Sequence, residues 1–449
     1  MSTYPKGSEW RLWDLHIHTP ASYNYTGGRF ATMTAAEKST AVTQIISNIN
    51  ESDVSAYAIN DYWTFDGYLE LRKAHEAGEA IKKTVFPAIE LRIESASKHR
   101  LNIHVILSDK LTVQRLNDFK GQLRLRLIDR PLSDEALIDY ARRLDGAKAK
   151  THGAPEGYLN DPVALARLGA ETAEITKASF EAALKTIPED HRLVMVPYDC
   201  YGGMEKIDWK VQPAEDLYFM QLVDIVEDRD QENIDLFACR KTPANEDFIE
   251  NFKVTIGGRP KPCISGSDGH SIASFKTWRA ETKTRKTWIK ADPTFEGLRQ
   301  ILFEPTARVR VQEASPAESY TKPFVSSVSI AQEFSPFPSN PQYENPRFSQ
   351  EPSLALNCDL VCVIGGRGTG KSCLVDYLGK AFGPASKTSP YVLSEHFTVV
   401  FNVSVMPKPS GDDGGWGAIV GALWKQPNEH WAGGDWGERK SSGCLGNIV

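Results

Sequence analysis

Short apolar runs of strand length recur through the first 310 residues, and segments of helical period separate several of them. The runs cover residues 13–17, 56–59, 85–91, 101–107, 193–197 and 262–265. A strand needs only roughly four to eight residues, whereas a helix needs a longer periodic segment. The alternation therefore predicts one large α/β domain, with either a barrel or a layered sheet.

Two of the intervening segments carry helix start signals. Ser133-Asp134-Glu135 precedes an apolar periodic stretch, which predicts a capped helix. Asp292-Pro293 precedes Phe295, Leu298 and Ile301, which predicts another.

The composition is that of a soluble protein. The 449 residues are 41% hydrophobic and 24% charged, with a net charge of −6, which excludes a wholly disordered chain and a mostly membrane-embedded one. No apolar stretch approaches the roughly 18 to 20 residues that span a bilayer, and the N-terminus lacks an apolar signal core. The seven cysteines are scattered, without a CxxC pair, and are predicted to be reduced. We expect a cytoplasmic protein with no membrane partner.

The composition changes after residue 310. Residues 311–352 hold 7 Pro and 8 Ser in 42 positions, so this segment is predicted to be a linker or short edge strands. The predicted division is a domain at 1–310, this segment at 311–352, and a partial nucleotide-binding domain at 353–449.

A phosphate-binding loop marks the start of the third segment. Residues 365–372 fit the pattern GxxxxGK[ST], between a predicted buried strand at 359–364 and a predicted helix at 371–382. Backbone N–H groups of such a loop cradle phosphates, the lysine reaches the terminal phosphates, and the hydroxyl holds Mg²⁺. The predicted ligands of ATP with Mg are Gly365, Gly366, Gly368, Thr369, Gly370, Lys371 and Ser372.

ATP hydrolysis has less support than ATP binding. Only 78 residues follow Lys371, and they contain no apolar strand that ends in an acidic pair. We expect either that the chain is truncated within its ATPase half or that another polypeptide supplies the missing parts. Association through this domain would give a homo-oligomer.

Two short motifs have the spacing of metal ligands. Asp14, His16 and His18 alternate with apolar residues, so a strand would present both imidazoles on one face, about 6 to 7 Å apart at Cα. Alone, this pattern also fits polar residues on a solvent-facing strand. Asp268 and His270, again two apart, form a second motif.

Two further polar residues stand in strands that otherwise look buried. Glu90 closes the apolar stretch 85–89, and His104 lies inside 101–107. Each alone would most often be a satisfied core residue. Together with the two motifs, they predict a site for zinc, manganese or iron.

These motifs resemble a known family. WDLHIHTPAS, INDYWTFDGY, FPAIELR, NIHVIL, GSDGH and WIKADPTFEGLRQILFEP are similar to the PHP (polymerase and histidinol phosphatase) phosphoesterases, and within them to TrlF-like proteins, in which a PHP domain is fused to an ATPase of the ABC/SMC type. The resemblance covers about residues 10 to 380. It implies a PHP-type distorted (β/α) barrel followed by the N-terminal part of a P-loop NTPase domain.

The resemblance also implies a ligand set. His16 and His18 would bind one ion, Glu90 would be a bridging carboxylate, and the further ligands would be His104, Asp268 and His270.

This sequence departs from the family at two places. A Tyr follows Asp61 where many members have a His, and no clear His-Pro motif follows, which leaves His152 and Asp199 as alternatives. One or two ions are therefore expected rather than three.

The implied chemistry is metal-assisted hydrolysis of a phosphoester. Asp61 would orient either a metal ligand or the nucleophile. Arg92 and Arg100 are candidate phosphate clamps, because a guanidinium matches phosphate geometry, and simple surface solvation is the alternative for each.

Three functions follow from this interpretation. The first is a nuclease acting on DNA or RNA, coupled to ATP binding, in DNA maintenance or anti-phage defence; its link to nucleic acid rests on analogy with SMC/ABC proteins. The second is a catalytically degenerate domain that serves as a nucleotide-sensing scaffold. The third is a small-molecule phosphomonoesterase.

Overall fold

The computed structural model divides the chain into two compact units. One is Trp10–Pro316, and the other combines residues 1–9 with 317–449. The residues described are 4–96, 100–200, 202–278, 284–320, 324–330, 354–364, 366 and 399–404.

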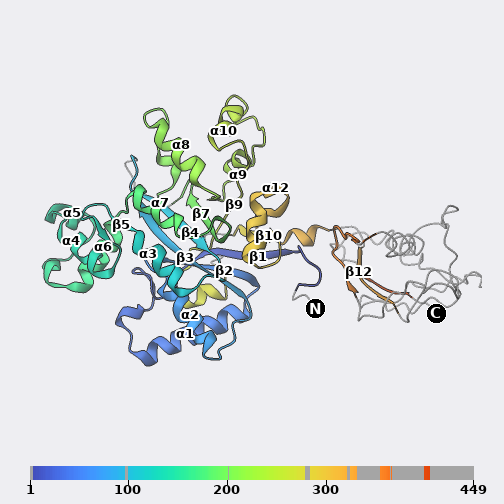
Figure 1. The fold of residues 1–449 in the computed structure, drawn as a ribbon, viewed down its shortest axis with the longest axis horizontal. Helices are drawn as coiled ribbons and strands as arrows, with labels where there is room; N and C mark the ends of the chain where they lie inside the picture. The colour runs from blue at the N-terminus through green and yellow to red at the C-terminus, as the bar shows by residue number, and fades with distance from the viewer. Residues whose placement is uncertain are drawn as a thin grey trace, which may run out of the picture. The chain divides into compact units, whose positions relative to one another are not determined.

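The first unit is built on one nine-stranded sheet with the order β11-β10-β1-β2-β3-β4-β7-β8-β9 (Figure 1). The strands are β1 (Trp10–Ile17), β2 (Val54–Tyr62), β3 (Thr84–Ile93), β4 (Leu101–Leu107), β7 (Arg192–Pro197), β8 (Ile225–Glu227), β9 (Cys263–Ile264), β10 (Lys286–Lys290) and β11 (Val309–Gln312). β1, β2 and β3 are parallel to one another, as are β7, β8 and β9. β4 runs antiparallel to both of its neighbours, and β10 is antiparallel to β1 and β11. The predicted α/β class is confirmed.

The sheet nearly closes on itself at the carboxyl end of β1. Ile17 forms an isolated parallel bridge with Gly269, which follows β9. The N–H of His18 donates to the Gly269 carbonyl at 3.0 Å, and the N–H of Asp268 donates to the His16 carbonyl at 2.8 Å. The two motifs that were singled out in the sequence therefore meet where the barrel-like sheet closes.

Helices fill most connections between the strands (Figure 1). They are α1 (Ala35–Glu51), α2 (Asp66–Glu76), α3 (Val113–Gln122), α4 (Asp134–Arg142), α5 (Gly146–Thr151), α6 (Pro162–Thr172), α7 (Lys177–Lys185), α8 (Pro213–Leu222), α9 (Gln231–Phe237), α10 (Ile249–Thr255), α11 (Phe295–Arg299) and α12 (Pro305–Arg308). Short 3₁₀ turns occur at Phe30–Thr32, Tyr158–Asn160, Glu189–His191, Met204–Lys206, Ile272–Phe275, Gln300–Leu302 and Pro316–Ser319, and β5 (Arg124–Leu125) pairs with β6 (Arg130–Pro131). α4, α5 and α6 pack around a small apolar cluster of their own.

Buried apolar side chains form two main clusters, one on each side of the barrel wall. The interior cluster takes alternate residues from the strands, such as Phe86 and Ala88 on β3, and includes Phe295 of α11. The outer cluster lies between the strands and the covering helices. Each fully buried large apolar side chain stabilises the fold by about 1.5–3 kcal/mol.

Both predicted helix starts are present, but one begins later than expected. Ser133 caps α4 by accepting from the N–H of Ala136 at 3.1 Å. The second helix is α11, and its cap is Thr294, which accepts from the N–H of Gly297 at 3.0 Å. Asp292-Pro293 therefore lies outside the helix that it was expected to start.

The second unit contains a small antiparallel sheet with the order β13-β12-β14. Its strands are β12 (Phe324–Ile330), β13 (Leu354–Ala355) and β14 (Val399–Ser404). Beside them, the Asn357 amide donates to the backbone carbonyls of Lys6 and Ser8.

The buried strand predicted at residues 359–364 is not formed. These six residues have no strand assignment, and Leu360 and Ile364 are 75% and 92% exposed. An apolar run becomes a buried strand only when strands flank it, and none of the described strands pairs with this one. Apart from Gly366, the predicted phosphate loop and the helix after it lie outside the described residues.

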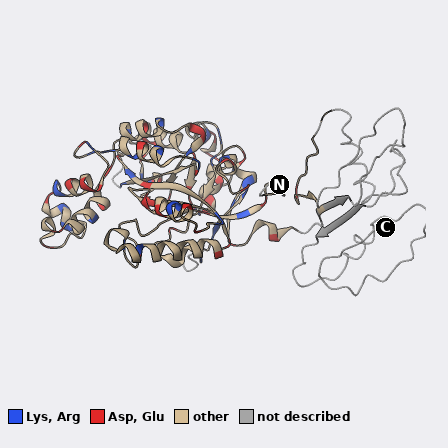
Figure 2. Ribbon diagram, turned by 60° about the horizontal axis from the view of Figure 1, so that its bottom comes forward, with Lys and Arg blue, Asp and Glu red and all other residues tan. Residues whose placement is uncertain are grey.

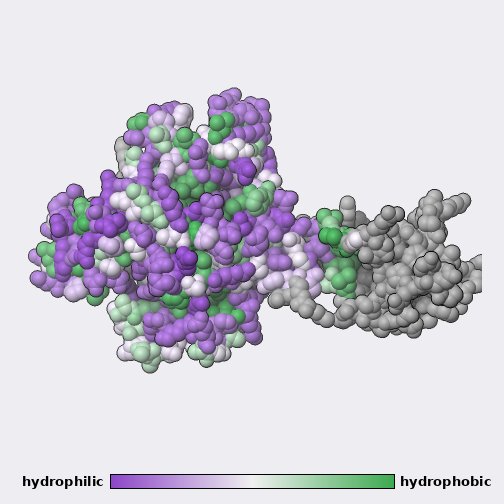
Figure 3. Space-filling view, viewed as in Figure 1, coloured by the Kyte–Doolittle hydropathy of each residue, from purple (hydrophilic) through white to green (hydrophobic). Residues whose placement is uncertain are grey.

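The surface of the first unit is mixed in charge and mostly hydrophilic. Figure 2 shows Lys and Arg interspersed with Asp and Glu over its helices, and Figure 3 shows apolar side chains scattered on a largely polar face. Within the described residues, no helix combines the length and the apolar character that crossing a bilayer requires.

Candidate metal centre

A bulge in β1 shapes the start of the site. Asp14 pairs with Tyr57 and Ile17 pairs with Ile59, so three steps along β1 match two steps along β2. Such a bulge changes which side chains face each side of the sheet. The strict alternation that was predicted for residues 13–18 does not hold across it.

The bulge leaves both histidines of β1 together in the interior. Trp13 and Leu15 belong to the interior cluster, whereas Ile17 packs in the outer one. His16 and His18 are 3% and 0% exposed, and their Nε2 atoms lie 3.2 Å apart. One ion can therefore contact both rings.

Two carboxylates lie against this pair of imidazoles. Glu90 Oε2 is 3.3 Å from His16 Nε2 and 3.5 Å from His18 Nε2. Asp268 Oδ1 is 3.7 Å from the first nitrogen and 3.6 Å from the second. Both carboxylates are buried, and Asp268 has the positive φ of 50° that L-residues rarely adopt. The two carboxylates therefore lie within reach of an ion held by the two imidazoles.

Two more histidines complete the cluster. His104 lies directly opposite Glu90 in the β3–β4 ladder, and its ring centroid is 4.5 Å from that of His16. The ring of His270 stacks on His18 with centroids 4.1 Å apart. The structure therefore brings together all six residues that were predicted as ligands.

The tautomer of His16 is set by a carboxylate. Glu227, at the end of β8, places its two oxygens 2.9 and 3.1 Å from His16 Nδ1. Because a carboxylate at this distance accepts, Nδ1 carries a proton that it donates. Nε2 is then left to face Glu90 and Asp268.

The tautomer of His18 is set through a hydroxyl. Ser22 Oγ donates to Asp61 Oδ1 at 2.8 Å, so its oxygen is free to accept from His18 Nδ1, 3.0 Å away. His18 therefore also holds its proton on Nδ1 and presents the lone pair of Nε2 to the cluster.

The rings of His104 and His270 also have a polar partner at Nδ1. His104 Nδ1 lies 3.2 Å from the amide oxygen of Asn60, whose nitrogen donates to two backbone carbonyls and so fixes the amide orientation. His270 Nδ1 lies 2.9 Å from the Asp268 carbonyl. Nε2 of His104 and of His270 is buried, and no described residue forms a hydrogen bond with it.

This donor set fits a divalent transition metal. His16 and His18 turn Nε2 toward each other, and the described residues offer no hydrogen bond to the buried Nε2 of His104, Nε2 of His270 or Oε2 of Glu90. Lone pairs 3.2 Å apart repel unless a cation or a proton lies between them. Imidazole with carboxylate suits zinc, manganese or iron, and a partner on the remote nitrogen is the usual support for a ligating histidine.

The electrostatics favour neutral ligands with one exception. Burial lowers the pKa of His18 and of His104 to about 4, and it also lowers the pKa of His270. Burial acts the same way on His16, but the Glu227 carboxylate outweighs it and holds the pKa of His16 well above its usual value. A proton on His16 Nε2 would therefore compete with a metal ion.

Asp61 lies behind the cluster. It accepts from the Thr19 N–H and hydroxyl, both at 2.7 Å, and from Ser22, and burial raises its pKa to about 7. A Cβ on Gly67 would collide with both Asp61 and Thr19, so only glycine fits there. Of the two roles that the sequence left open, these contacts favour the orientation of a ligand, His18.

A pocket of about 440 Å³ opens beside the cluster, and both candidate phosphate clamps line it. Arg92 already donates to the carbonyls of Ala170 and Glu171 and to the hydroxyl of Tyr23. Arg100 differs, because its buried Nη1 has no hydrogen-bond partner among the described residues. Arg100 therefore has more donor capacity left for an anion.

The residues at which the sequence departs from the family lie in different parts of the structure. Tyr62 stacks on His18 with centroids 4.8 Å apart and an interplanar angle of 11°, and it also lines the pocket. His152 is exposed at the end of α5, and the Asp199 carboxylate lies 3.9 Å from Lys206 Nζ. In the described part of the chain, neither His152 nor Asp199 belongs to the groups able to hold a metal.

Three supporting residues were missed at the sequence level. Ser22 and Asn60 are small polar residues without a distinctive spacing. Glu227 closes the short apolar run Ile225–Val226, which is the signal that identified Glu90, so it could have been found.

Comparison with known proteins gives structural matches only. No protein-family model and no curated protein matches the sequence. An amidohydrolase from Chromobacterium violaceum has a TM-score of 0.34 at 14% identity, and the match covers 69% of this chain and 100% of that one. A candidate metal-dependent phosphoesterase from Bifidobacterium adolescentis has a TM-score of 0.28 at 12% identity, covering 59% and 90%. A lesion-specific endonuclease from Pyrococcus furiosus has a TM-score of 0.33 at 13% identity, covering 66% and 56%.

Proposed function

We propose that this chain is a metal-dependent phosphoesterase of the PHP type that cleaves phosphodiesters of DNA or RNA. The observation that carries the proposal is a cluster of four histidines and two carboxylates in which His16, His18 and Asp268 lie close enough to hold one ion, and in which each ring has a partner at Nδ1. Core histidines that serve packing alone have no reason to share this orientation.

The residues divide into ligands and supports. One or two ions would be bound by His16, His18, Glu90, His104, Asp268 and His270. Such an ion supplies Lewis-acid chemistry, which activates water and offsets charge on phosphoryl oxygens. Glu227, Ser22 with Asp61, and Asn60 hold the protons that keep the ligand nitrogens available.

The pocket next to the cluster favours a phosphate ester. Arg100 and Arg92 place two guanidinium groups in the same pocket as four of the ligands, and a guanidinium pairs with phosphate oxygens in a bidentate way. Tyr23 and Tyr62 line that pocket too, and aromatic rings of this kind stack with nucleobases. These contacts favour a nucleic acid over a small phosphomonoester.

The second part of the proposal concerns nucleotide binding. The loop with Lys371 and Ser372 would bind ATP with Mg in an ABC/SMC-like domain, couple ATP binding to cleavage and allow the chain to form a homo-oligomer. By analogy with SMC/ABC proteins, the biological setting would be DNA maintenance or anti-phage defence. The sequence pattern at 365–372 is the support for this part.

A specific observation favours one other function, a catalytically degenerate scaffold. Tyr62 stacks on His18 at the position where many PHP enzymes have a ligating histidine. The scaffold would bind metal without turning over any ester.

The test compares the full chain with three variants. Metal content and manganese-dependent cleavage of single-stranded DNA, double-stranded DNA, a chromogenic phosphodiester and a phosphomonoester would be measured. We expect His16→Ala and Asp268→Ala to lose both metal and diester cleavage, and His152→Ala, which removes an exposed histidine outside the cluster, to retain both. Metal binding without cleavage of any ester would support the scaffold, and cleavage of the monoester alone would support a small-molecule phosphatase.

A further inference from the structure

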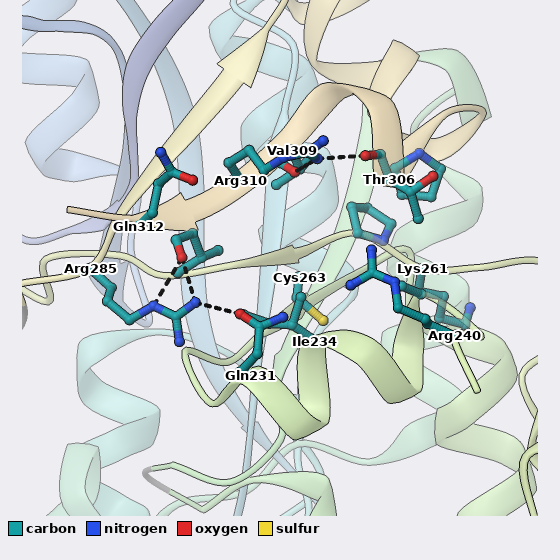
Figure 4. A pocket seen from close by; sticks show the side chains of 14 residues that line it. Gln231, Ile234, Arg240, Lys261, Cys263, Arg285, Thr306, Val309, Arg310 and Gln312 are labelled. Atoms are coloured by element: carbon teal, nitrogen blue, oxygen red, sulfur yellow. Dashed lines mark hydrogen bonds between the residues drawn. The ribbon is translucent and has the colours of Figure 1, made fainter. Parts of the chain in front are cut away.

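A second pocket lies at the seam between the two ends of the strand order. β9 and β11 are those ends, and a cleft of about 360 Å³ lies between them, lined by residues of α9, β9, α12 and β11 (Figure 4). It contains none of the metal-centre residues. Lys261 precedes β9 whereas Asp268 follows it, so the cleft and the metal centre lie toward opposite ends of that strand.

The cleft is lined by four basic side chains. They are Arg240, Lys261, Arg285 and Arg310, and no Asp or Glu is among the described residues that line it. Figure 4 shows Arg285 at one end of the cleft and Arg240 with Lys261 at the other. The walls are therefore cationic along their whole length.

Arg285 hydrogen-bonds to residues on both sides of the cleft, and no described acidic group neutralises its charge. Its guanidinium donates to the Val311 carbonyl on β11, to the Arg229 carbonyl after β8 and to the amide oxygen of Gln231 (Figure 4). All of these acceptors are neutral. Within the described residues, no carboxylate lies within ion-pair distance of Arg285.

Lys261 and Arg310 also donate hydrogen bonds only to neutral acceptors among the described residues. Lys261 donates to the Val223 carbonyl, and burial lowers its pKa. Arg310 lies over the ring of Trp10, 5.5 Å from its centroid, and donates to the carbonyls of Thr306 and Val309. Neither has an ion-pair partner in the described part of the chain, and both keep N–H groups to spare.

Arg240 is the exception, because it pairs with Asp235 through one nitrogen. The cleft thus holds two guanidinium groups, Arg285 and Arg310, without an ion-pair partner among the described residues, and Lys261, whose charge Asp224 partly offsets from a longer distance. Gathering like charges at one place is unfavourable unless an anion offsets them.

We propose that this cleft binds a small molecule bearing two or more phosphate groups. Its volume is within the range of small-molecule sites. Guanidinium and ammonium donors with spare N–H groups match phosphate oxygens, and such donors lie at both ends of the cleft (Figure 4). A ligand bound there would bridge β9 and β11, which backbone pairing does not join.

The experiment uses inorganic pyrophosphate as the probe. Two other places in the chain could take it, the predicted phosphate loop and the pocket at the metal centre. The titration is therefore done by calorimetry on the metal-free full chain carrying Lys371→Ala, and again with Arg100→Gln added. We expect binding at one site, unchanged by Arg100→Gln.

The decisive variant combines Arg240→Gln with Arg310→Gln in the same background. Both side chains are exposed, so the fold should survive, and thermal melting checks this. Loss of two charge-assisted contacts should weaken pyrophosphate binding by about tenfold or more. The matched control, Arg142→Gln with Arg299→Gln, removes two arginines outside the cleft, each paired with an acid on its own helix, and should bind as before. Absence of binding, equal binding by the decisive variant, or loss of binding only in Arg100→Gln would each overturn the proposal.

Discussion

Replacing Ser22 by alanine tests whether the second layer of residues controls the metal centre. Ser22 is fully buried, and its hydroxyl donates to Asp61 and accepts from His18 Nδ1. It also accepts from the N–H of Tyr62 at 3.3 Å. The substitution removes one oxygen atom and leaves every proposed ligand in place.

Two magnitudes follow from these contacts. Asp61 keeps both hydrogen bonds from Thr19, so the main loss is the partner of His18 Nδ1–H. One buried polar group left without a partner costs about 1–3 kcal/mol of the free energy of unfolding. Loss of the support for a ligating histidine typically weakens metal binding by about 10- to 100-fold, which corresponds to about 1.4–2.7 kcal/mol. We therefore expect a folded Ser22→Ala variant with a raised Kd for metal.

The assay is competition for Mn²⁺ or Zn²⁺ with a chromogenic chelator, combined with thermal melting. Ser179→Ala is the matched control, because Ser179 is also buried and donates to the Thr176 carbonyl on α7, outside the cluster. Both variants should lose stability, but only Ser22→Ala should lose metal affinity. If the two variants bound metal equally well, the reasoning that Nδ1 contacts orient the ligands would be wrong.

Three further predictions concern the same centre. Glu227→Gln keeps the shape of the side chain but removes the charge that raises the pKa of His16, so a pH titration of metal binding should show about tenfold weaker limiting affinity at high pH, with release at a lower pH. Gly266→Ala places a Cβ against His16, so melting and metal titration should show a loss of about 1–3 kcal/mol in the free energy of unfolding together with weaker binding. Removing the metal with a chelator should lower the melting temperature, since an ion at about 100 times its Kd adds about 2.7 kcal/mol to the free energy of unfolding; an unchanged melting temperature would show that the fold holds no ion.

The sequence located the longer strands of the barrel because each has a mostly apolar centre. The run Leu101–Leu107 coincides with β4, whereas the run at 13–17 is three residues shorter than β1. Backbone pairing extends a strand into polar residues, which an apolar run does not mark. β8 was missed because Ile225–Glu227 has only three residues, too few to show a period.

The segment 359–364 shows that an apolar run does not always form a strand. The run Leu360–Ile364 is as apolar as the barrel strands, yet these residues are exposed and unpaired. An apolar composition means that burying the segment is energetically favourable. Whether the segment is buried depends on neighbouring strands. Those neighbours are contributed by other parts of a chain, so the run alone cannot predict the outcome.

The candidate ligands could be read from the sequence by their spacing or because they interrupt an apolar run, but the contacts that their supports make could not. Glu227 on β8 contacts His16 on β1 at 2.9 Å, although β2, β3, β4 and β7 separate these strands in the sheet order. They meet only because the sheet curls until Ile17 pairs with Gly269. A local motif can present a pair of imidazoles, but the partner that fixes the proton on one of them comes from a strand near the other end of the strand order. The tautomer of His16 is therefore a property of barrel closure, and a substitution that opens the contact between Ile17 and Gly269 should weaken metal binding without replacing any ligand.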